Sequence, residues 1–253
     1  EMHELWGVLE TDKDRMTNES TKKMLSELID YCRVRRTVLE FDEDYAADPQ
    51  IQDMYRNLGC FEICMKFMGL LDSVEEDEDG NFSEEAENTR HLCLLVNTLL
   101  YWYFLGNPKN QQQGFGELEM FLETLDMGIN SHLIIKAIFK NNEALMRLVP
   151  HSTLSELVDR ISKIGRSHHY LTLFASISHV GEKNIAENQF EIVKSLTSPG
   201  CLKKVSCFLC PVESPEYEDK REQMKMFAGD ARDLALDDLT PLLAYHLMFL
   251  EVL

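Results

Sequence analysis

"TLSELVDRISKIGRSHHYLTLFASIS", residues 153–178, decides the fold class of this chain. Its first half spaces apolar residues one helical turn apart, at Leu154, Leu157, Val158, Ile161 and Ile164. Gly165 follows where such a helix should end, and a second helix is predicted for 167–179. Because only a turn joins the two helices, we expect an antiparallel hairpin that packs its apolar stripe against a neighbouring pair.

Helical spacing of apolar residues covers nearly the whole chain, and no segment alternates convincingly like a β-strand. Helices are predicted for 20–37, 49–58, 60–71, 84–105, 115–125, 131–141, 153–164, 167–179, 184–196, 215–228 and 240–253. The sequence therefore predicts an all-α fold, an armadillo- or HEAT-like helical-repeat solenoid of antiparallel helix hairpins. Successive hairpins share little sequence, so a compact helical bundle is the alternative.

We expect residues 1–253 to form a single helical-repeat region with two inserted loops. The first loop is acidic and covers about 73–83, and the second, rich in proline, glycine and cysteine, covers about 197–219. The chain opens on Glu1 rather than methionine and stops at Leu253 inside an amphipathic stretch. We therefore expect a region excised from a larger protein.

Composition limits the partners of this chain. A formal net charge of −19 argues against nucleic acid and anionic lipid, since phosphate binding requires clustered lysine and arginine, whereas basic proteins remain possible partners. The seven cysteines suit a reducing, cytosolic compartment. The longest apolar stretch, Leu92 to Leu105, is shorter than the ~18–20 residues that cross a bilayer. It is expected to be a helix buried in protein and not inserted in a membrane.

No motif in the sequence supports catalysis. A Ser/His/Asp order, a nucleophile elbow, a phosphate-binding loop and a dinucleotide fingerprint are all missing, so we expect neither an enzyme nor a cofactor. Cys207 and Cys210 form a C-x-x-C, but no second ligand pair lies near them to complete a zinc site. Buried thiols are the interpretation that we favour.

The acidic loop imitates a calcium-binding loop. With Gly80 as its sixth residue, the first, third and fifth positions are Glu75, Asp77 and Asp79. The twelfth position, which should supply a bidentate glutamate, is Ala86. We therefore expect no metal site, and the three acids are at most a weak calcium candidate in a solvated charged loop.

Five blocks of the sequence belong together: "MYRNLGCFEICMKFMGLL" (54–71), "YWYFLGNPKNQ" (101–111), "IIKAIFKNNEAL" (134–145), "GRSHHYLTLFASISHVGEKNIAENQFEIVKSL" (165–196) and "PLLAYHLMFLEVL" (241–253). In order and spacing, they resemble the RIH (ryanodine receptor and inositol trisphosphate receptor homology) regions of intracellular calcium-release channels. The last block and "LGNPKNQ" look most like the central regulatory segment of an inositol trisphosphate receptor.

The resemblance implies a regulatory, coupling helical domain of a ligand-gated, tetrameric calcium channel. It places the chain on the cytosolic face of the endoplasmic or sarcoplasmic reticulum membrane, against neighbouring domains and subunits of the channel. There the region would relay ligand and calcium signals towards the pore. A ryanodine receptor segment is the nearer alternative, and a free-standing HEAT-like adaptor that binds protein partners is the other.

The resemblance also bears on individual residues. Of the basic positions with which the family's amino-terminal RIH region holds its ligand, only Arg56 and Lys109 are matched. Pro49, Asp53, Asn107 and Pro108 occupy others, so no trisphosphate site is expected here. The residues expected to matter fix turns between helices: Arg56, Asn57, Gly59, Asn107, Pro108, Asn110, Gln111, Gly165 and Arg166.

Overall fold

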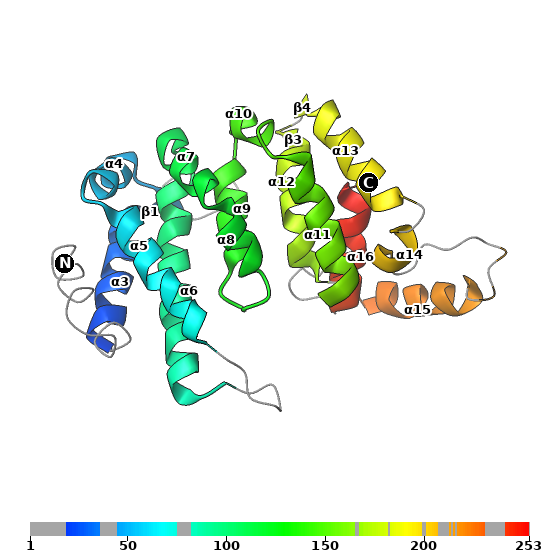
Figure 1. The fold of residues 1–253 in the computed structure, drawn as a ribbon, viewed down its shortest axis with the longest axis horizontal. Coiled ribbons are helices and arrows are strands. Elements are labelled where there is room, and N and C mark those ends of the chain that lie inside the picture. The colour runs from blue at the N-terminus through cyan, green and yellow to red at the C-terminus, as the bar shows by residue number, and fades with distance from the viewer. Residues whose placement is uncertain are drawn as a thin grey trace. The chain divides into compact units, whose positions relative to one another are not determined.

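The computed structural model describes residues 19–35, 45–74, 82–164, 167–181, 183–198, 201–206, 213, 215, 217–230 and 241–252. The chain forms two compact units, Glu1–Asn142 and Glu143–Leu253 (Figure 1). Helices make up most of the described residues, and the all-α class predicted from the sequence is confirmed. The organisation of the whole chain as a single array stays a prediction.

Unit 1 is built around one long helix, α6. Its elements are α3 (Glu19–Cys32), β1 (Arg33–Arg35), β2 (Tyr45–Ala47), α4 (Pro49–Asn57), α5 (Cys60–Met68), the 3-10 helix η1 (Gly69–Ser73), α6 (Glu84–Phe104), α7 (Pro108–Gly116), α8 (Leu118–Glu123) and α9 (Ser131–Phe139). Helices α3, α5 and α9 pack along α6, and α4 and α7 lie at its carboxyl end (Figure 1). Helix α6 therefore joins most of the unit into one core.

Local sequence explains where α6 begins and ends. The Ser83 hydroxyl accepts a hydrogen bond from the Ala86 N–H at 3.1 Å, and glutamates fill the first turn, where the helix dipole favours negative charge. Gly106, with a φ of 73°, turns the chain away after Leu105. One face of the apolar stretch predicted to be buried is fully enclosed, with Leu92, Val96 and Leu100 at its centre, whereas Leu94 and Trp102 are half-buried. Among the described helices, none combines the length and the apolar character needed to cross a membrane.

Unit 2 packs shorter helices together. Its elements are α10 (Glu143–Met146), α11 (His151–Ile164), the 3-10 helix η2 (His168–Leu171), α12 (Thr172–Ser178), β3 (His179–Val180), β4 (Lys183–Asn184), α13 (Ala186–Thr197), α14 (Leu202–Val205), α15 (Tyr217–Asp230) and α16 (Pro241–Val252). Helix α16 lies against η2 and α12, and the buried Tyr245 hydroxyl donates to the Val205 carbonyl at 2.7 Å. This bond fixes α16 to the end of α14.

Several elements differ from the sequence prediction, including α10, α14 and the first part of α7, which were not predicted. The helix predicted for 20–37 ends at Cys32, because Arg33–Arg35 pair with Tyr45–Ala47 as antiparallel strands. A second two-stranded pair, β3 with β4, closes the turn before α13. Within residues 153–178, the helix predicted for 167–179 is divided into η2 and α12, and α11 packs most closely against α13 and α14 rather than against α12.

The described cysteines are all buried and none forms a disulfide: Cys32, Cys60, Cys64, Cys93 and Cys201. Burial raises the pKa of the Cys32 and Cys93 thiols to about 12. The Sγ atoms of Cys60 and Cys64 lie 4.0 Å apart in the core of unit 1. These thiols behave as small apolar core groups. Cys207 and Cys210, the predicted buried pair, lie outside the described residues.

Candidate functional site

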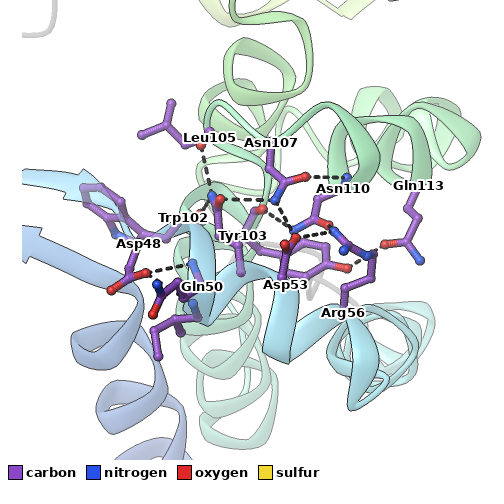
Figure 2. A network of polar contacts seen from close by, with 12 residues as sticks. Asp48, Gln50, Asp53, Arg56, Trp102, Tyr103, Leu105, Asn107, Asn110 and Gln113 are labelled. Carbon is purple, nitrogen blue, oxygen red and sulfur yellow. Dashed lines mark hydrogen bonds and ion pairs between the residues drawn. The ribbon is translucent and has the colours of Figure 1, made fainter.

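Three turn positions singled out in the sequence, Arg56, Asn107 and Asn110, meet beside α4 where α6 ends and α7 begins (Figure 2). Gln52, on α4, is 2% exposed, and its Nε2 donates to the Trp102 carbonyl at 2.7 Å and to the Leu105 carbonyl at 2.9 Å. Carbonyls in the last turn of a helix have no partner within the helix. The Gln52 amide therefore supplies the hydrogen bonds that the buried end of α6 lacks.

Asn107 completes this arrangement from the other side. It is the N-cap of α7, and its Oδ1 accepts from the Asn110 N–H at 3.3 Å. Its Nδ2 lies 3.3 Å from both the Gln52 Oε1 and the Asp53 Oδ1. We call Gln52, Asn107 and the Trp102 and Leu105 carbonyls the first clasp. Each polar group of these two amide side chains thus has a partner, and the Asn107 Oδ1 alone finds it within the helix that Asn107 caps.

A second layer of polar contacts connects α4 to α7. Arg56 forms an ion pair with Asp53 at 2.8 Å and donates to the Asn110 Oδ1 at 2.8 Å. The buried Asn110 in turn donates to the Tyr103 carbonyl at 2.8 Å (Figure 2). The Tyr103 hydroxyl donates to the Gln113 Oε1 at 2.6 Å, and burial raises the pKa of this tyrosine.

Gln111 repeats at the end of α9 what Gln52 does at the end of α6. Its Nε2 donates to the Ala137 carbonyl at 2.9 Å and to the Lys140 carbonyl at 3.0 Å. Its Oε1 accepts from the Asn142 Nδ2 at 2.9 Å. We call Gln111, Asn142 and these two carbonyls the second clasp. The two clasps hold the carboxyl ends of the two helices that flank α7.

The remaining predicted positions are placed as follows. Gly59 has a φ of 71° and separates α4 from α5, and Pro108 is the first residue of α7. Lys109 is exposed on the first turn of α7. Five positions lie outside the described residues: Glu75, Asp77, Asp79, Gly165 and Arg166.

The polar contacts of this region hold helices in fixed positions. Within the described part of the chain, no group of three or more histidine, cysteine or acidic side chains is placed to hold a metal ion. Of the two basic residues that match the family's ligand site, Arg56 lies within this network and is already bonded to Asp53 and Asn110. The arrangement can therefore position helices. The positive charge of Arg56 is paired with Asp53 inside the domain.

Gln52 and Asn142 were not predicted from the sequence, although a signal for Gln52 exists. Asp48-Pro49-Gln50-Ile51-Gln52 and Asn107-Pro108-Lys109-Asn110-Gln111 share a cap, a proline at the first helical position and a glutamine four residues after the cap. The Asp48 carboxylate accepts from the Gln50 N–H at 2.8 Å, as expected of a cap. The shared pattern places each glutamine one turn inside its helix.

The RIH domain family model matches residues 22–208 of this chain, which is more than half of its length. The chain belongs to the RIH domain family. This is the family of the ryanodine and inositol trisphosphate receptors, and the resemblance seen in the sequence is thereby confirmed. No curated protein gives a significant match. Both clasps of the RIH domain lie within the matched residues.

The ionisation of Asp53 offers a direct test of the contacts at the first clasp. The hydrogen bond from Asn107, followed by that from Arg56, lowers the pKa of Asp53 below its ordinary value of 3.8. Since the folded pKa is the lower one, the stabilising contribution is present above pH ~4 and is lost as the pH falls through the folded value. We expect Asn107→Ser to move the pKa of Asp53 back towards 3.8.

Carboxyl carbon chemical shifts measured by NMR against pH give this pKa directly. Glu27→Gln, a neutralisation on the exposed side of α3, is the control and should leave the pKa of Asp53 unchanged. A wild-type pKa at or above 3.8 would contradict the described contacts.

Proposed function

We propose that this RIH domain is a regulatory and coupling module of a ligand-gated intracellular calcium-release channel, most similar to the inositol trisphosphate receptors. The domain transmits ligand and calcium signals towards the pore, on the cytosolic face of the endoplasmic reticulum membrane, and performs no catalysis. Its partners are neighbouring domains and subunits of one tetrameric channel. The observation that carries this proposal is the family match over residues 22–208.

The construction of unit 1 supports a coupling role. Gln52 and Gln111 are buried, and each joins the first turn of one helix to the last turn of another. Buried, satisfied hydrogen-bond networks allow few alternative arrangements, and close-packed interiors transmit strain. A displacement applied to α4 is therefore carried to α6 and α7 with little loss.

The contacts of Arg56 support the absence of a ligand role. A trisphosphate site requires several basic groups that point to one place. Arg56 is engaged with Asp53 and Asn110, and only Lys109 of the matched basic residues is exposed near it. Calorimetric titration of the domain with inositol trisphosphate should therefore give no binding. Micromolar affinity would contradict the proposed role as a module without its own ligand.

Calcium release from stores tests the proposed function itself. We expect the full-length protein, expressed in cells that lack their own release channels, to restore release of stored calcium when inositol trisphosphate is supplied. At matched protein level, Phe104→Ala should weaken the response, since it loosens the core of unit 1, whereas Phe190→Ala on the exposed face of α13 should not. A full-length protein that restores no release with any agonist would refute the proposal.

A further inference from the structure

The two clasps have the same construction at two points of unit 1. In each, a glutamine binds two carbonyls three residues apart, Trp102 and Leu105 or Ala137 and Lys140. In each, an asparagine two residues after the second carbonyl donates to the same glutamine.

The backbone repeats as well. The Leu105 and Asn107 N–H groups donate to Tyr101 and Phe104, and those of Lys140 and Asn142 donate to Lys136 and Phe139. A left-handed residue, Gly106 with a φ of 73° or Asn141 with a φ of 59°, lies within each turn. The two sites are therefore two copies of one structural device.

Helix α7 takes part in both copies. Its N-cap, Asn107, donates to Gln52 in the first clasp, and its own Gln111 is the centre of the second. Asn110 lies between them and ties α7 both to Arg56 and to the Tyr103 carbonyl. All three side chains are at most 9% exposed, and they stand within the first turn of one helix. A shift of α7 that breaks one clasp must strain the other.

We infer that α7 couples the two clasps energetically, so that loosening either clasp loosens the other. Coupling between sites requires a contiguous element that both of them bias, and by thermodynamic reciprocity it acts equally in both directions. The coupling itself does not depend on the proposed function. Only its role in a channel rests on that function, and there α7 would be the route by which a displacement crosses unit 1.

Hydrogen exchange of the 253-residue chain tests this coupling. Gln52→Met keeps the length of the side chain and removes its amide. It should accelerate exchange at the Lys140 and Asn142 N–H groups of the second clasp by on the order of threefold to tenfold. Helix α3 packs on both α4 and α6 but supplies no group to either clasp, so it reports general loosening of unit 1, and its N–H groups should accelerate less. The reciprocal variant, Gln111→Met, should accelerate exchange at the Leu105 and Asn107 N–H groups.

Matched controls exist on the same helices. Gln50→Met and Gln112→Met make the same substitution at exposed positions of α4 and α7, and they should leave exchange at both clasps at wild-type rates. The double variant Gln52→Met/Gln111→Met should lose less stability than the sum of the single variants, because the second break removes an interaction that the first has already weakened.

The inference is overturned if, in Gln52→Met, exchange at the Lys140 and Asn142 N–H groups is accelerated no more than exchange in α3. It is also overturned if the stability lost in the double variant equals the sum of the losses in the two single variants. Should Gln52→Met fail to fold, Asn107→Ser replaces it. Serine keeps an oxygen that can cap α7 but lacks the amide N–H with which Asn107 reaches the Gln52 Oε1, and the Lys140 N–H is again the probe. Hydrogen exchange is measured on the 253-residue chain, whereas calcium release is measured on the full-length protein in cells. Absence of coupling in the exchange experiment therefore leaves the test of the proposed function unaffected.

Discussion

Phe104→Ala is expected to lower the free energy of unfolding of unit 1 by about 3–5 kcal/mol, the largest effect of any substitution considered. The Phe104 ring is completely buried at the carboxyl end of α6. It meets the rings of Phe61, Tyr103 and Phe121 edge-on, with centroids 5.9, 5.4 and 6.3 Å away. Removing it leaves a cavity among three large side chains that cannot close in around it.

Urea denaturation followed by tryptophan fluorescence measures this effect, because Trp102 lies on α6 two residues before Phe104. Phe190→Ala is the matched control. The Phe190 side chain is 65% exposed on α13, and its removal should change the free energy of unfolding by no more than about 0.5 kcal/mol. A loss below about 1 kcal/mol for Phe104→Ala would mean that the described aromatic core is wrong.

Gly114→Ala should destabilise unit 1 by about 1–3 kcal/mol, although alanine is the better helix former. Gly114 is buried on α7 between α6 and α9. A Cβ atom there would lie 2.7 Å from the Phe104 Cζ and 2.9 Å from the Ile138 Cγ1. Both neighbours are fully enclosed, so neither can move away without disturbing the core.

Gly116→Ala, on the same helix, provides the control. A Cβ atom at Gly116 meets nothing within 4 Å, so this variant should be neutral or stabilised by up to ~1 kcal/mol. The cost of Gly114→Ala should also fall in a Phe104→Ala background, because one of the clashing groups is then gone. Equal stabilities for the alanine variants at positions 114 and 116 in urea denaturation would contradict the close approach of α7 to α6.

Local signals predicted most of the helices, because caps, prolines and apolar spacing act within one or two turns. Asp48-Pro49 predicted the start of α4. The predicted start of α6 at residue 84 is correct, and there Ser83 caps the helix and glutamates fill its first turn. Helix α7 was missed between 108 and 114, although Asn107-Pro108 carries the same signal as Asp48-Pro49. Its glutamine- and glycine-rich sequence has little apolar periodicity.

Long-range pairings could not be predicted. The side chain of Gln52 bonds carbonyls 50 and 53 residues further along the chain, and no spacing rule connects such positions. Arg33–Arg35 continue the helical pattern of α3 and become a strand only because Tyr45–Ala47 lie beside them. For the same reason, Asn107 and Gln111 were predicted as turn residues, but the partners that they bind were not predicted.

The clasps have a consequence for the proposed role in a calcium-release channel, where calcium concentrations change. Surface ion pairs weaken as counter-ions accumulate, and this chain carries a net charge of −19 that attracts cations. Bonds between a neutral amide and a backbone carbonyl neither titrate nor bind counter-ions, and those of Gln52 and Gln111 are shielded from water. The spacing of α4, α6, α7 and α9 should therefore remain the same through a rise in calcium, even while the charged surface around them responds to it.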